Sequence, residues 1–201
     1  GSAPELPPED YEPRRLASLL PRLREAAVAR ILTLDALDHP ELTLVAQAPA
    51  GRSGLNVRAY QLRDPRPRAY VACRSVVARG PGEAFSRALQ ADFDGASEVA
   101  LETAASADCS RGGVRRESFA PGLEQYQVEA DGRGLLVMRD SFARGWAAWI
   151  DGAPAPVLRA NGKYRAVPVD RGRHQVPLRY RAPGLAWGAA LSAPGGPGTP
   201  R

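Results

Sequence analysis

The 201-residue chain is long enough to bury a core as one medium-sized domain or two small ones. Its hydrophobic share of 44% excludes wholesale disorder. Basic residues outnumber acidic ones by 27 to 22, and all of them except Lys163 are arginines. Because these arginines are scattered along the chain rather than gathered in one segment, the composition argues against a nucleic-acid partner.

Residues 1–13 are rich in proline and acidic side chains, which is typical of an extended linker; its first two residues look like a cloning remnant. The next segment has apolar residues at helical spacing. Pro21 interrupts this pattern, so we expect either two short helices or one helix that begins near Pro21. The β-branched residues within 29–34 predict a strand. The helical positions are Leu16, Leu19, Leu20 and Leu23.

The middle of the chain combines strands with one helix. Alternating apolar and polar residues predict strands at 41–47 and 55–62. The apolar run 69–78 predicts one buried strand. Proline followed by helix-forming residues predicts a short helix over 80–90, and 97–102 reads as another short strand.

Glycine-containing turns divide the last third of the chain, at 131–134, 151–152 and 170–173. Each lies between alternating segments, so we expect three β-hairpins. The fold class predicted is therefore mainly β: an antiparallel β-sandwich of hairpins, jelly-roll or immunoglobulin-like, with a smaller α+β N-terminal portion.

These patterns divide the chain into four parts. After the linker at 1–13, the α+β portion is expected over 14–113 and the β-sandwich portion over 114–183. The remainder, 184–201, begins with an apolar run about half as long as the ~20 residues of a membrane-spanning helix. It is either the stump of a membrane helix or a disordered tail.

Two tryptophans three residues apart precede the turn at 151–152. In a strand, residues at this spacing point to opposite faces, so Trp146 and Trp149 do not form one platform. We expect Trp146 to face the core. Trp149 lies on the outer side, where it serves either packing or ligand contact.

Cysteine and histidine give few candidates for chemistry. Cys73 and Cys109 either form a disulfide or remain two unpaired thiols, and their spacing does not suit a zinc site. His39 and His174 are the only histidines, and no nucleophile, phosphate-binding or dinucleotide-binding motif is present. We therefore assign no catalytic residue, no metal and no cofactor.

Carboxylates flank the tryptophan segment at Asp140 and Asp151. A pair of carboxylates is the machinery of glycoside hydrolysis, but the spacing along a sequence does not give their separation in space. The simpler interpretation is that Asp140 ends a strand and Asp151 begins a turn.

Sugar binding is the intrinsic activity that these residues suit best. An aromatic face stacks on the apolar face of a sugar ring, while carboxylate, amide and guanidinium groups bond its hydroxyls. A structural role is the alternative for each candidate. Asn161, for example, also belongs to a turn dipeptide. The candidate ligand-binding residues are Trp149, Asp140, Arg159, Asn161 and Tyr164.

A series of short motifs runs through 134–184: Asp140-Ser141, Gly145-Trp146, Asp151-Gly152, Arg159-Ala160-Asn161, Val167-Pro168-Val169, Gly172, His174 and Tyr180. In this order they resemble the C-terminal soluble segment of YfhO-like bacterial membrane proteins. Residues 57–71 resemble an upstream segment of the same family more loosely. The sequence departs from the family pattern at Phe142-Ala143-Arg144 and at Gly162-Lys163.

YfhO-like proteins are polytopic and similar to GT-C glycosyltransferases, which use polyprenyl-phosphate sugars. The resemblance implies a domain on the extracytoplasmic face of the cell membrane, without catalysis of its own, that assists glycan or acceptor recognition in cell-envelope glycosylation. Its implied partners are the membrane-embedded remainder of the same polypeptide and a glycan or lipid-linked sugar.

Two other classes of function remain open. A free-standing carbohydrate-binding module would show sugar affinity in isolation. A structural interaction domain would show none, and its basic surface would bind anionic lipid or wall polymer in a salt-sensitive way.

Overall fold

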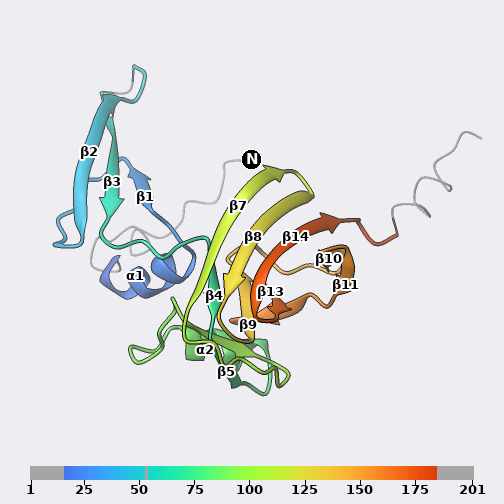
Figure 1. Cartoon of the computed structure of the whole chain (residues 1–201). Helices are drawn as coiled ribbons and strands as arrows, with labels where there is room; N and C mark the ends of the chain where they lie inside the picture. Colours follow the sequence, from blue (N-terminus) through green and yellow to red (C-terminus); the bar gives the residue numbers. More distant parts are fainter. Residues whose placement is uncertain (1–15, 53, 185–201) are drawn as a thin grey trace, which may run out of the picture.

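The computed structural model describes residues 16–52 and 54–184 (Figure 1). This part of the chain contains two helices and fourteen strands, and the strands form three sheets. The structure thus confirms the mainly β class. The expectations for 1–13 and for the apolar run and tail beyond residue 184 lie outside the described residues.

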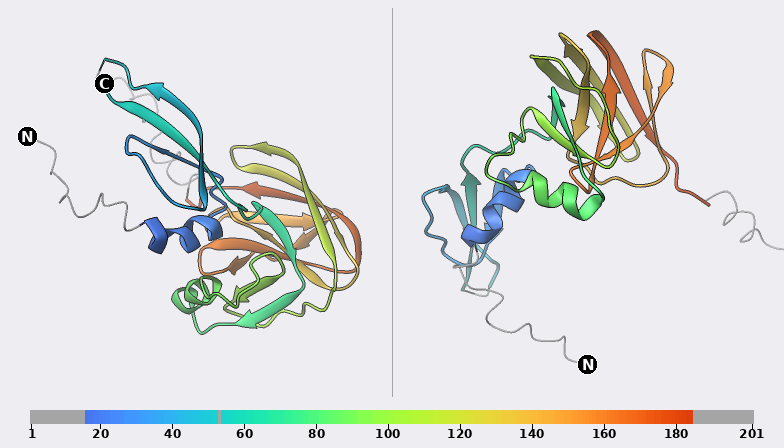
Figure 2. Two further views of the ribbon diagram at one scale, coloured as in Figure 1. Left: turned by 90° about the vertical axis from the view of Figure 1, so that its left-hand side faces the viewer. Right: turned by 90° about the horizontal axis from the view of Figure 1, so that it is seen from below.

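The N-terminal elements form a small unit beside the main body. Helix α1 (Leu16–Glu25) is followed by β1 (Arg30–Thr33), β2 (Leu42–Pro49) and β3 (Asn56–Leu62), which pair in the antiparallel order β1-β3-β2. The three strands confirm the sequence prediction. The prediction for the helix is wrong, because one helix runs through Pro21. This sheet stands away from the body in the views of Figures 1 and 2.

A five-stranded antiparallel sheet forms one layer of the main body. Its order is β11-β10-β14-β8-β7. Tyr126 and Val128 of β8 and Val176 and Leu178 of β14 are buried, whereas the residues between them are half-buried. This is the alternation expected of a sheet with one face against a core. The strands are β7 (Gly112–Ala120), β8 (Leu123–Ala130), β10 (Trp146–Ile150), β11 (Ala153–Ala155) and β14 (Gly172–Tyr180).

A six-stranded sheet forms the other layer, in the order β4-β9-β13-β12-β6-β5. Its two edge strands, β4 and β5, are separated in the sequence by Cys73 alone, so the sheet curls until its edges almost meet. The single strand predicted over 69–78 is therefore two strands. The members are β4 (Ala69–Ala72), β5 (Arg74–Val77), β6 (Glu98–Leu101), β9 (Gly134–Met138), β12 (Leu158–Ala160) and β13 (Tyr164–Val169).

Helix α2 (Pro81–Ala88) links β5 to β6, which pair in parallel. A parallel pair requires such a crossover connection, and Pro81 begins the helix as the sequence predicts. Ala84 and Ala88 of α2 pack with Phe93 and Ala100 in a small separate cluster.

The two layers enclose the main core. Leu136 and Met138 of β9 and Val167 of β13 contact Tyr126 and Val176 from the opposite sheet in one cluster of buried residues. Strand β9 is buried along its whole length, because its other face contributes to a second cluster on the far side of the six-stranded sheet.

The turns at 131–134 and 170–173 do not close hairpins. The first leads from β8 to β9 and the second from β13 to β14, so each carries the chain from one sheet to the other. A strand buried on both faces, as β9 is, belongs at the centre of the curled sheet and not beside β8. The predicted hairpin at 151–152 is confirmed, since β10 pairs with β11.

Cys73 and Cys109 form a disulfide at this curled edge, where the chain passes from β4 to β5. Both residues are buried in the main core. The bond ties the edge of the six-stranded sheet to the loop that precedes β7.

We predict that the double variant Cys73→Ala, Cys109→Ala has a free energy of unfolding lower by about 3–4 kcal/mol, because the bond closes a loop of 36 residues in the unfolded chain. Urea unfolding of both proteins measures the difference. The variant should be insensitive to a reducing agent, which should destabilise only the parent. Equal midpoints for parent and variant would contradict the prediction.

Candidate functional site

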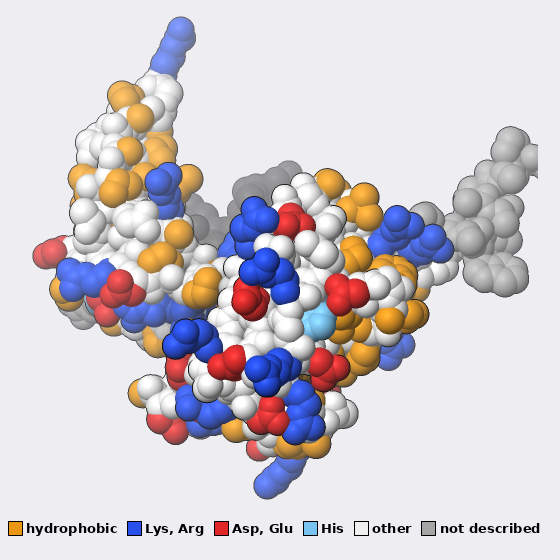
Figure 3. Space-filling view, viewed as in Figure 1, with side chains coloured by type: hydrophobic (Ala, Val, Ile, Leu, Met, Phe, Trp, Pro, Cys, Tyr) orange, Lys and Arg blue, Asp and Glu red, His pale blue; other side chains and the backbone are white. Residues whose placement is uncertain are grey.

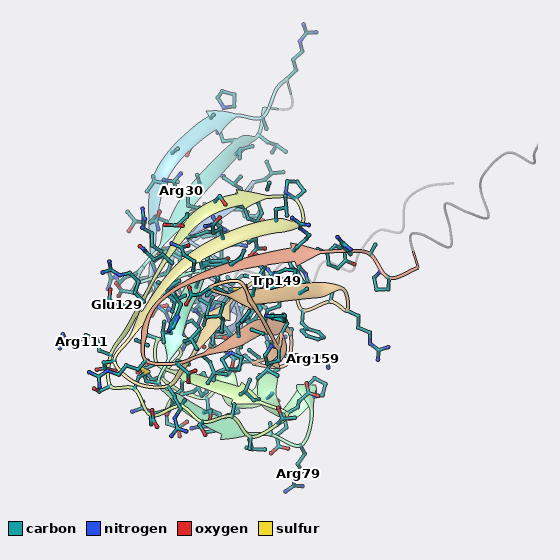
Figure 4. All side chains as sticks on the ribbon, turned by 45° about the vertical axis from the view of Figure 1, so that its right-hand side comes forward. Arg30, Arg79, Arg111, Glu129, Trp149 and Arg159 are labelled. Atoms are coloured by element: carbon teal, nitrogen blue, oxygen red, sulfur yellow. A yellow bond between two sulfur atoms is a disulfide. The ribbon has the colours of Figure 1, made fainter. Side chains whose placement is uncertain are left out.

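The two tryptophans of β10 lie on opposite faces of the five-stranded sheet, as predicted. Trp146 packs against the main core, with its ring centroid 5.4 Å from that of Tyr180 and 3.9 Å from the guanidinium carbon of Arg165. The neighbouring Ala148 is buried on the same face. Trp149 is half-buried and lies on the outer face (Figure 4).

Trp149 lines a groove of about 460 Å³ on this outer face. The strand register explains how the groove forms. Pro177 of β14 lies opposite Gln125 of β8, which in turn lies opposite Ser118 of β7. Residues that oppose one another across strands share a face. Ala148 of β10 lies opposite Leu178 of β14, so the next positions, Trp149 and Pro177, begin a row that crosses four strands. Leu123 and Arg179 form part of a second row beside it.

The polar side chains of this face are held in place by one another. Gln125 Nε2 donates hydrogen bonds to Gln175 Oε1 at 3.2 Å and to Glu117 Oε2 at 3.3 Å. Arg115 in turn donates to Glu117 at 2.9 Å. Of these side chains only Gln125 lines the groove. A side-chain amide offers both donors and acceptors, as a sugar hydroxyl does, so this position suits a polyhydroxylated ligand.

The charge on this face is mixed rather than of one sign. Over β7, β8 and β14, blue and red side chains alternate in Figure 3. One example is the exposed pair Arg173 and Glu129, with 3.1 Å between Nη2 and Oε2. Such a surface favours a neutral polar ligand over a strongly charged one.

Asp140 does not reach the groove. It follows β9 and bonds Arg68, while its Oδ2 lies 3.8 Å from Arg165 Nη2. Arg165 is almost fully buried and pairs with Glu124 at 2.8 Å. Tyr126 donates its hydroxyl hydrogen to the same carboxylate at 2.8 Å, and burial, followed by the charge of Glu124, raises the pKa of Tyr126. Asp140 thus ends a chain of charges between the sheets.

Asn161 and Tyr164 lie in the interior on the far side of the six-stranded sheet. Asn161 is fully buried; its Oδ1 accepts from the Ala100 N–H at 2.9 Å and its Nδ2 donates to Glu25 at 2.7 Å. Burial raises the pKa of Tyr164 to about 12. Both residues are therefore part of the framework rather than of a ligand surface.

Arg159 lies in neither of these two regions and contacts Phe142 and Glu102. Its guanidinium carbon lies 4.9 Å from the ring centroid of Phe142, and its Nη1 is 3.4 Å from Glu102. Arg159 does not line the groove at Trp149. The structure thus distributes the five sequence candidates over separate regions, and only Trp149 lies in the groove. Alternation in 123–130 and 172–180 could have identified the outward glutamines, but the sequence does not show that these strands pair.

Asp140 and Asp151 have separate partners. Asp151 starts the β10–β11 turn, and its carboxylate accepts from the Gln175 N–H at 2.8 Å and lies 2.7 Å from His174 Nδ1. These bonds hold the pKa of Asp151 below its usual range. Asp151 therefore fixes the turn to the start of β14, which is the structural role considered from the sequence.

Neither family models nor curated proteins nor solved structures gave a match to this chain. In the described part of the chain, no group of three or more histidines, cysteines and carboxylates could hold a metal ion. No helix between residues 16 and 184 that the structure describes is long and apolar enough to cross a membrane.

Glu25 is the centre of a second buried charge cluster. It is fully buried at the end of α1, and its Oε2 bonds Arg66 and lies 3.4 Å from Nη2 of the buried Arg139. The Arg139 guanidinium also stacks over the ring of Tyr70, at 4.4 Å from the centroid.

We predict that Glu25→Ala lowers the free energy of unfolding by about 3–5 kcal/mol, because the variant leaves the Arg139 charge buried without its carboxylate. Glu41→Ala is the matched control. It removes the partly exposed ion pair with Arg24 and should cost about 1 kcal/mol or less. Urea unfolding of the two variants measures the difference, and equal losses would argue against a buried role for Glu25.

The ionisation of Asp131 makes the stability of the fold depend on pH in the acid range. Its carboxylate accepts the backbone N–H groups of Ser110 and Arg111, each at 2.9 Å, and these bonds lower its pKa. A carboxyl group with a lowered pKa in the folded state stabilises it above the unfolded pKa of about 3.9, and this stability is lost as the pH falls through the folded pKa.

We therefore predict that Asp131→Asn reduces the drop in thermal unfolding midpoint between about pH 5 and pH 2. At neutral pH the variant should unfold at a lower temperature than the parent. Asp38→Asn, at an exposed position, controls for the loss of one negative charge. A parent and an Asp131→Asn variant with parallel acid profiles would refute the prediction.

Proposed function

We propose that this chain is a glycan-contacting domain without catalysis of its own, and that the groove at Trp149 is its contact surface. The observation that carries the proposal is a half-buried tryptophan on an outer sheet face, in one row with Gln125, whose side-chain amide is already held by two hydrogen bonds. The indole face would stack on the apolar face of a sugar ring, and Gln125 and Ser118 would bond its hydroxyls.

The dimensions of the row support an extended ligand. Four strands separated by about 4.8 Å give a platform of roughly 14 Å between Trp149 and Ser118. This length accommodates more than one sugar ring, so we propose an oligosaccharide or polymer rather than a monosaccharide. The mixed charges on the surrounding face favour a neutral glycan.

The resemblance of residues 134–184 to YfhO-like proteins supports a setting for this activity. In that setting the chain is the extracytoplasmic domain of a polytopic glycosyltransferase-like membrane protein and holds acceptor glycan for the membrane-embedded part. A free-standing carbohydrate-binding module would use the same groove. Apolar segments of ~20 residues encoded upstream in the same reading frame would indicate the membrane protein, and their absence would indicate the free-standing module.

We predict that the chain binds neutral cell-wall-type oligosaccharides and that Trp149→Ala weakens this binding at least about tenfold, because it removes the stacking surface. Isothermal titration calorimetry measures the affinity of the variant without relying on tryptophan fluorescence. Phe119→Ala is the matched control, since Phe119 is an aromatic residue 60% exposed on β7 and lies outside the groove.

Two results would count against the proposal. The first is the absence of heat of binding at millimolar sugar with a parent protein that unfolds cooperatively. The second is an equal loss of affinity in the Phe119→Ala and Trp149→Ala variants, which would indicate that the site is elsewhere.

A further inference from the structure

Exposed large hydrophobic side chains are concentrated in the three-stranded sheet and its connections. Of the nine such residues in the described part of the chain, five fall within residues 32–55. They are Leu32, Leu34, Leu44, Val45 and Leu55, which are between 48% and 71% exposed. A concentration of exposed apolar side chains on one projecting element is typical of an interaction surface.

The apolar side chains occupy both faces of this sheet. Leu32, Ala59 and Ala46 form one row across the three strands, with Val57 and Ala48 next to them on the same face. Leu44 pairs with Tyr60 and so lies on the opposite face. A protein partner would cover one face, whereas a medium that surrounds the strands would cover both.

The charges of the sheet are separated along its length. Residues 42–62 contain Arg52 and Arg58 and no aspartate or glutamate. Arg52 lies in the turn between β2 and β3, at the end that points away from the body, where Figure 3 shows basic and apolar side chains and no acidic ones. Apart from the buried Glu25, the acidic residues of this unit lie in the loop before β2, and one of them, Glu41, is paired with Arg24 at 2.6 Å.

The backbone limits how this end can be covered. Within residues 16–52 and 54–184 no strand pairs with the outer edge of β2, and the register shift beside Val45 interrupts this edge, which disfavours pairing with a strand of another chain. Unpaired backbone groups are also excluded from the hydrocarbon core of a bilayer. The headgroup region offers both water for the edge and an apolar boundary for the side chains.

We infer that the β2–β3 end of this sheet docks on a lipid bilayer that carries anionic headgroups. Leu44, Val45 and Leu55 enter the boundary between headgroups and acyl chains, and Arg52 meets the headgroup phosphates. The body does not obstruct this approach, since the sheet projects beyond it in Figures 1 and 2. The surface is separate from the Trp149 groove and does not depend on the proposed glycan binding.

Flotation of the 201-residue chain with vesicles tests this inference. We expect binding to vesicles of phosphatidylcholine mixed with phosphatidylglycerol, much weaker binding to pure phosphatidylcholine, and loss of binding at high salt. Arg52→Gln should weaken binding about fivefold, the effect of one basic residue at an anionic surface. Arg79→Gln is the matched control, because Arg79 is 96% exposed but lies at the far end of the molecule from this sheet (Figure 4).

The double variant Leu44→Gln, Val45→Gln tests the apolar contribution and should weaken binding by about tenfold or more. Its thermal unfolding midpoint should match that of the parent, which shows that the fold is intact. Equal loss in Arg52→Gln and Arg79→Gln would overturn the inference, because binding would then follow total charge. Absence of vesicle binding, together with self-association that the double variant abolishes, would assign the surface to a second copy of the chain.

Discussion

The position of the N-terminal unit depends on one buried carboxylate. Glu25 has no exposed surface, and a charge in such a place is tolerated only when opposite charges and hydrogen-bond donors surround it. Arg139 extends from the end of β9, Arg66 from the segment before β4, and Asn161 from the turn after β12. These three side chains tie α1 to the main body. The direction of the three-stranded sheet that follows α1 is set by this same cluster.

The curl of the six-stranded sheet determines which face of the main body stays uncovered. One face of β4, β9 and β13 packs on the five-stranded sheet. The opposite face of the curled sheet encloses the second cluster, against which Ala105 and Ala107 pack. Val71 of β4 lies so close to β7 that a side chain at Gly112 would come within 2.5 Å of it. One edge of the five-stranded sheet is thereby closed against β4, and its outer face remains the broad open surface of the body.

Local patterns predicted the elements that local forces decide. The β10–β11 hairpin follows from its Asp-Gly turn, and the opposite faces of Trp146 and Trp149 follow from the two-residue period of a strand. Strand pairing depends on which strands are buried on both faces, and this is not a local property. The turns at 131–134 and 170–173 resemble the Asp-Gly turn in sequence, but they cross between the sheets and do not close hairpins. Asn161 likewise resembles an exposed turn residue in the sequence, because what buries it is a contact that is distant along the chain. Its partner Glu25 lies 136 residues away, and no pattern near Asn161 indicates it.

The groove at Trp149 differs from the other polar clusters in what its hydrogen bonds accomplish. The bonds around Glu25 and Arg165 neutralise groups that the fold has already buried. Those of Gln125 hold half-buried amides that water would otherwise satisfy, so folding alone does not require them. Their effect is to fix donors and acceptors beside an indole that contributes little to the core. A surface ordered in this way loses less side-chain entropy when a ligand binds, which is the advantage of a preformed site.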